Sequence, residues 1–172
     1  MSLSTRAIAG IGAVVLIGAG TVAGSIAYAN SEGKPSEHKV TLTVGTSSVE
    51  SAPSCYNGGQ PLDQAMLAKC RTEAKDARDN NKIVSSDVES SDRVGVGVPP
   101  EIADKGWFAF TDGGAQGEAV IAQDVRGSTY SGSVPASTIL NGSGTTTVTV
   151  VAADQKSNEV YGIWYFDLKQ KN

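Results

Sequence analysis

Two hydrophobic patterns with different periods alternate along residues 39–172. Val40, Leu42 and Val44 alternate with polar residues, which is the period of a half-buried strand. The same period, or a short apolar run, predicts further strands at 94–98, 107–110, 119–123, 145–152 and 159–168. The last of these segments is apolar on both faces, so we expect it to lie in the centre of a sheet.

A helical period replaces the strand period between Pro61 and Arg78. Apolar residues there fall on one helical stripe, which is formed by Leu62, Met66, Leu67, Cys70, Ala74 and Ala77. Pro61 suits the first turn, and Lys and Arg residues gather toward the C-terminal end, where they complement the helix dipole. We find no second convincing helical period in the later segments.

The order of these elements predicts a mainly β fold. Six or seven short strands are joined by turns rich in Gly, Ser, Asn and Asp. Together with the one short inserted helix, they predict an immunoglobulin-like antiparallel sandwich with Trp107 in its core. An open barrel is the main alternative.

The first 29 residues form a separate hydrophobic segment. Residues 7–29 carry no charge and follow Arg6, which is typical of a membrane-targeting element. The A-x-A sequence at 27–29 favours cleavage as a signal peptide, whereas a length of 23 residues favours retention as a transmembrane helix. Gly20 and Gly24 form a G-x-x-x-G pattern, through which membrane helices pack closely.

These observations predict the organisation of the chain. Residues 1–29 are expected to be a signal peptide or an uncleaved transmembrane anchor, which would contact the membrane through residues 7–29. Residues 30–38 are expected to be a flexible linker, and 39–172 the β-sandwich domain. In both cases the domain lies outside the cytoplasm, either secreted or anchored to the outer face of the cell membrane.

Cys55 and Cys70 are the only two cysteines, and they predict a disulfide. A disulfide persists in an oxidising compartment outside the cytoplasm. A redox site would favour a C-x-x-C spacing, and a metal site would need further ligands that His38, the single histidine, cannot supply. Because Cys70 lies on the apolar stripe, we expect the disulfide to join the helix to the loop that follows the first strand.

The charge and the remaining motifs do not indicate a reaction. Without residues 1–29 the chain has 13 Lys and Arg residues against 18 Asp and Glu residues, a net charge of −5, which does not favour nucleic-acid binding. An S-x-x-K sequence at 36–39 lacks the companion motifs of acyl-enzymes. The acidic stretch 87–92 lacks the Gly and the distal Glu of a calcium-binding loop and is interpreted as a solvated turn. We therefore expect no catalytic residue, no metal and no cofactor.

Several segments between residues 39 and 112 form a distinctive set: Val40-Thr41-Leu42-Thr43-Val44-Gly45, Ser54-Cys55-Tyr56-Asn57-Gly58-Gly59, Pro61-Leu62, Cys70 and Pro100-Glu101-Ile102-Ala103-Asp104-Lys105-Gly106-Trp107. Together they resemble a family of small actinobacterial envelope proteins of unknown function. The resemblance implies a secreted or lipid-anchored, β-rich protein with a disulfide. This chain lacks the acylated cysteine of the lipid-anchored members, so secretion or a protein span is expected instead.

Two functions are consistent with these features. The first is a non-catalytic secreted or surface domain that binds another envelope component through loops. One such loop is 126–133; the other is 99–106, with Pro99, Pro100, Glu101, Asp104 and Lys105 as its candidate partner-binding residues. The alternative is a single-span accessory subunit of an integral membrane complex, such as a respiratory assembly, packed through Gly20 and Gly24.

Overall fold

The computed structural model describes residues 38–115, 117–154 and 156–171. The predictions for residues 1–29, including Gly20 and Gly24, and for linker residues 30–37 lie outside the described residues. None of the helices within the described ranges has the length and apolar character needed to cross a membrane.

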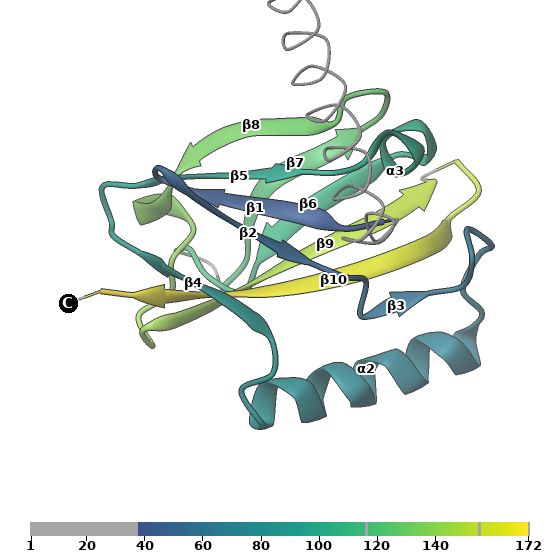
Figure 1. Ribbon diagram of the computed structural model, residues 1–172, viewed down its shortest axis with the longest axis horizontal. Coiled ribbons are helices and arrows are strands. Elements are labelled where there is room, and N and C mark those ends of the chain that lie inside the picture. Colours follow the sequence, from purple (N-terminus) through teal and green to yellow (C-terminus); the bar gives the residue numbers. More distant parts are fainter. Residues whose placement is uncertain (1–37, 116, 155, 172) are drawn as a thin grey trace, which may run out of the picture. The chain divides into compact units, whose positions relative to one another are not determined.

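Two β-sheets form the described part of the chain (Figure 1). The four-stranded sheet has the order β2 (Ser47–Ser51), β1 (Val40–Val44), β5 (Arg93–Gly97) and β8 (Tyr130–Pro135). The six-stranded sheet has the order β3 (Cys55–Tyr56), β10 (Glu159–Gln170), β9 (Thr145–Asp154), β6 (Trp107–Thr111) and β7 (Ala119–Val125), and β4 (Val84–Val88) also pairs with β10.

The two sheets share one hydrophobic core, to which Leu42 and Val96 contribute from one sheet and Trp107, Trp164 and Phe166 from the other. Both indoles are buried, and each donates a hydrogen bond to a backbone carbonyl, so their N–H groups are satisfied. The expected core position of Trp107 is confirmed. The mainly β, immunoglobulin-like antiparallel sandwich with one short inserted helix is confirmed as two packed sheets.

Strand β10 lies in the interior of its sheet, as its two apolar faces predict. It pairs antiparallel with β9 on one side, and with β3 and β4 on the other. The pairing with β4 is parallel, with Phe166 opposite Val84, so the sheet is not wholly antiparallel. Figure 1 shows β4 crossing beside β10 after it leaves the helix.

Helix α2 (Gln64–Asp79) lies against the outer face of β10 (Figure 1). The helix begins two residues after Leu62, the first residue of its apolar stripe, because the Asp63 carboxylate accepts a hydrogen bond from Met66 N at 2.7 Å and caps the first turn. Pro61 and Leu62 therefore precede the helix. Buried Leu62 nevertheless packs beside Cys55 and Cys70, in a small cluster separate from the main core.

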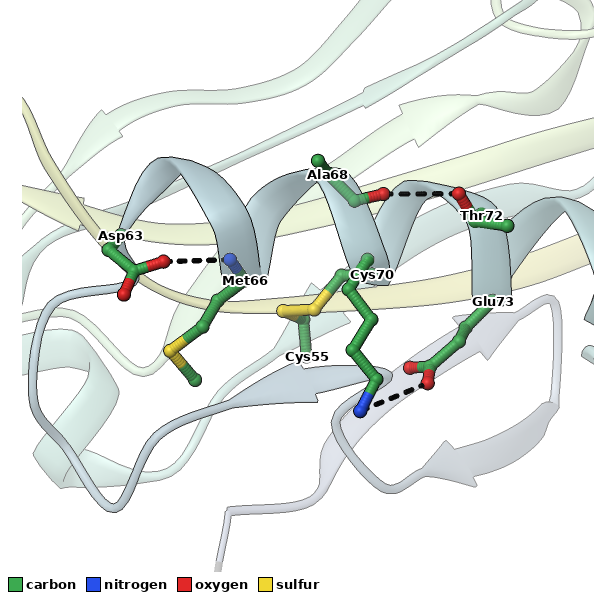
Figure 2. Close-up of a disulfide and its surroundings, with 8 residues drawn as sticks. Cys55, Asp63, Met66, Ala68, Cys70, Thr72 and Glu73 are labelled. Atoms are coloured by element: carbon green, nitrogen blue, oxygen red, sulfur yellow. Dashed lines mark hydrogen bonds and ion pairs between the residues drawn. A yellow bond between two sulfur atoms is a disulfide. The ribbon is translucent and has the colours of Figure 1, made fainter.

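The predicted disulfide between Cys55 and Cys70 is confirmed (Figure 2). It joins α2 to β3, and β3 in turn pairs with β10 through Ile163 opposite Cys55. We expected Cys55 in a loop directly after the first strand. That placement is wrong, because β2 intervenes and Cys55 begins a strand of its own.

Besides β3, several other elements of the described residues were missed or assigned to loops. Strands β2, β4 and β8 are mostly polar and only partly buried, so their side chains show no clear period. The expected loop 126–133 is strand from Tyr130 onward. The expected loop 99–106 contains helix α3 (Pro100–Lys105), which starts where Pro100 suits a first helical turn and buries Ile102 and Ala103. A short 3₁₀ helix, η1 (Ala136–Thr138), follows β8.

Candidate functional site

Three segments that are distant in the sequence meet around α3. We call this surface the α3 end. Glu101 and Lys105 come from α3 itself, and His38 precedes β1. Tyr56 ends β3, and Tyr161 lies near the start of β10. Two of the predicted partner-binding residues, Glu101 and Lys105, therefore each contact a distant segment of the chain.

His38 connects the beginning of β1 to α3. Its Nδ1 atom lies 3.0 Å from Glu101 Oε1 and 3.4 Å from the Tyr56 hydroxyl, and its ring lies 4.4 Å from the Tyr56 ring. The backbone of His38 has a φ of 76°, and its carbonyl accepts the Trp164 indole N–H at 2.9 Å. His38 was assigned to the linker, but it already contacts the sandwich.

Lys105 connects α3 to two other segments. Its ammonium donates a hydrogen bond to the Gly59 carbonyl at 3.1 Å and lies 4.0 Å from the centroid of the Tyr161 ring. The second contact is a cation–π interaction. The Tyr161 hydroxyl donates to Glu159 at 2.8 Å, and this bond to a carboxylate raises the pKa of Tyr161 above its ordinary value of 10.0.

Backbone bonds and an ion pair hold the other side of α3. Gly127 N donates to the Ala103 carbonyl at 2.8 Å, and Ala153 N donates to the Gly106 carbonyl at 3.0 Å. The Arg126 guanidinium donates a hydrogen bond to the Asp104 carbonyl of α3 at 3.4 Å and pairs with Asp154 at 3.0 Å. The pKa of Asp154 lies below its ordinary value because the carboxylate accepts the Lys156 backbone N–H and pairs with Arg126. Helix α3 is thus fixed at both ends.

The five predicted binding residues differ in how they face solvent. Pro100, Glu101 and Asp104 are exposed, whereas Pro99 and Lys105 are half-buried. Lys105 acts within the molecule, because its ammonium is held by Gly59 and Tyr161. The exposed surface of α3 is therefore formed by Pro100, Glu101 and Asp104 on a fixed helix.

The chemistry available at the α3 end is that of hydrogen bonding and charge. The imidazole of His38 contacts a carboxylate and a phenol, and no serine, threonine or cysteine side chain is bonded to it within residues 38–171 as described. The same ranges contain no group of three or more His, Cys, Asp or Glu side chains that could hold a metal ion. The arrangement suits recognition of a polar surface.

Sequence reasoning did not find the contacts of His38 and Tyr161. The His38 and Glu101 side chains come from positions 63 residues apart, and no periodic pattern relates them. The segments quoted for the family resemblance do meet here, because Lys105 in one of them binds Gly59 in another.

A comparison with known proteins finds no matching family model, no matching curated protein and no matching solved structure. The resemblance to actinobacterial envelope proteins therefore stays a prediction. The arguments about function below rest on the chain itself.

Proposed function

We propose that the chain is a non-catalytic envelope protein outside the cytoplasm, and that its sandwich binds another envelope component through the α3 end. The observation that carries this proposal is the convergence of three separate segments on α3, which leaves Pro100, Glu101 and Asp104 exposed on a fixed support. A fixed surface loses little conformational entropy when it binds. The disulfide is compatible with an oxidising compartment.

A crosslinking experiment in the cells that produce the protein tests this proposal. A photoreactive residue replaces Asp104 in the full chain, and a matched one replaces Glu73, which is exposed on α2. We expect a discrete crosslinked envelope component from position 104 only. The proposal would be refuted by equal products from both positions or by none from position 104.

A second variant separates binding from folding. Glu101→Lys reverses an exposed charge, since 45% of the Glu101 side chain is accessible, and it changes the contact with His38. We expect loss of the position-104 crosslink with an unchanged thermal unfolding midpoint, because exposed charge pairs add little stability.

The alternative, an accessory subunit of an integral membrane complex, requires residues 1–29 to be retained. Measurement of the intact mass of the natural protein decides this requirement, because a mature chain that begins at Asn30 excludes the span. If the segment is retained, Gly20→Leu with Gly24→Leu should release the protein from its complex while leaving it membrane-bound. Unchanged co-purification of that variant would contradict packing through these glycines.

A further inference from the structure

One flank of α2 carries a row of cations beside a tyrosine. Arg71, Lys75 and Arg78 line a groove of about 170 Å³ together with Ala74, Ile83 and Tyr165. With about 100° of rotation per residue, the three cations fall within an arc of about 60° around the helix. They therefore form one basic stripe beside the apolar stripe that packs on β10.

No acidic side chain is among the described residues that line this groove. Glu73 lies on the opposite side of the helix from the stripe and pairs with Lys69 at 3.7 Å, whereas Asp79 follows Lys75 by four residues and lies beside the stripe. Among the ion pairs between described residues, none involves Arg71, Lys75 or Arg78. Like charges spaced four residues apart, such as Arg71 and Lys75, destabilise a helix slightly. Their position toward the C-terminal end of α2, where positive charges complement the helix dipole, offsets part of this cost.

Tyr165 supplies a fixed polar group at the same place. It lies on β10 opposite Thr149, on the sheet face that α2 partly covers, and its side chain is half-buried. Burial raises the pKa of Tyr165, while the charges of Arg78 and Arg71, which line the same groove, act in the opposite direction. The groove thus combines two guanidiniums, one ammonium and one hydroxyl.

We propose that this groove binds a phosphate group carried by an envelope component. Guanidinium groups match phosphate oxygens with paired hydrogen bonds, and a lysine adds a mobile positive charge. A phosphate offers more acceptor oxygens than a carboxylate, so it can engage several of these donors at once. The proposal rests on the proposed binding function and adds the chemical class of a ligand, at a surface separate from the α3 end.

The direct test follows phosphate binding by NMR on the full chain in uncharged detergent micelles. Inorganic phosphate is titrated against sodium chloride of matched ionic strength, and the Nε–H signals of Arg71 and Arg78 are observed. We expect saturable shifts with phosphate only. Replacement of both residues, Arg71→Gln with Arg78→Gln, should weaken the apparent affinity by about tenfold or more, because each charge-assisted bond is lost.

A matched control removes the same charge elsewhere. Lys69→Gln with Lys156→Gln lowers the net charge by two but leaves the groove intact. We expect its affinity for phosphate to change by less than about twofold, since exposed charges at a distance are screened. Equal weakening in both double variants, or no shift beyond that caused by chloride, would overturn the proposal.

The phosphate could belong to a lipid headgroup or to a water-soluble phosphodiester, and two further arms distinguish these sources. In both arms the full chain is placed in phosphatidylcholine nanodiscs. The first arm tests a lipid headgroup by including phosphatidylglycerol in the nanodiscs. The second arm tests a soluble phosphodiester by adding poly(glycerol phosphate). If the signals of Arg71 and Arg78 shift in one arm, that arm identifies the source of the phosphate. If they shift in neither arm, the proposal is overturned. Crosslinking from position 104 is read separately, so failure here does not imply failure of the α3 end as a binding surface.

Discussion

Removal of the Cys55–Cys70 disulfide should loosen α2 without unfolding the sandwich. Apart from the disulfide, α2 is held by a small cluster in which only Cys55, Leu62 and Cys70 are buried, and this cluster is separate from the main core. The two main-core tryptophans lie elsewhere. Elements with few buried contacts open locally before the whole domain unfolds. The helix is therefore expected to behave as its own opening unit once the disulfide is absent.

The size of the effect follows from the loop that the disulfide closes. The two cysteines are separated by 15 residues. On the chain-entropy treatment, a loop of this length is worth about 3 kcal/mol, which corresponds to a change of about two orders of magnitude in an opening equilibrium. Amide exchange of α2 should accelerate by about that factor in Cys55→Ala with Cys70→Ala, whereas amides of β9 should keep their protection.

Native-state hydrogen exchange of the full chain measures this difference residue by residue. Wild-type protein under reducing conditions serves as the control, because it loses the same covalent bond while keeping both side chains. Unchanged protection of α2 would show that the disulfide adds nothing to its docking. An equal loss of protection in β9 would show that helix and sandwich open together, and either result would refute the reasoning.

Two further predictions concern the sandwich. A Cβ at Gly113 would overlap the Ile139 carbonyl oxygen and lie 2.8 Å from Asn141 N, whereas one at Gly142 would meet no atom within 4 Å. Gly113→Ala should therefore lower the free energy of unfolding by about 1–3 kcal/mol in urea titrations, and an equal effect of Gly142→Ala would contradict this explanation. Because the folded pKa of Asp154 lies below its ordinary value of 3.8, its interactions stabilise the folded protein at pH values above 3.8. That contribution is lost as the pH falls through the folded pKa of Asp154. On acidification below about pH 4, the stability of Asp154→Asn should therefore decrease less than that of the wild type. Parallel pH profiles of the two proteins would refute this assignment.

The sequence predicted the strands that bury apolar residues in a regular pattern and missed strands that are held mainly by backbone pairing. Strand β1 and the two long strands β9 and β10 bury apolar residues in a regular pattern, which the period reveals. Strand β2 buries only Ser51 fully, and β8 buries no residue fully. Their positions depend on pairing with β1 and β5. A single sequence contains no direct signal for such partners.

The same distinction applies to the α3 end. The exposed residues of α3 could be nominated from the sequence because prolines and charges follow a predicted strand. The contacts that fix the surface could not, because Lys105 binds a carbonyl 46 residues away and His38 contacts a carboxylate 63 residues away.

The contacts of Lys105 also bear on how the family resemblance should be interpreted. Two of the segments that carry it contain Gly59 and Lys105, which bind each other within the fold. Such residues serve folding whether or not a partner exists, so they give no support to a binding function by themselves. Glu101 is exposed but also contacts His38, whereas Asp104 is exposed and contributes its backbone carbonyl, not its side chain, to the contact with Arg126. A binding role of the α3 end must therefore be tested at Glu101 and Asp104, whereas substitution of Lys105 would disturb the support and the surface together.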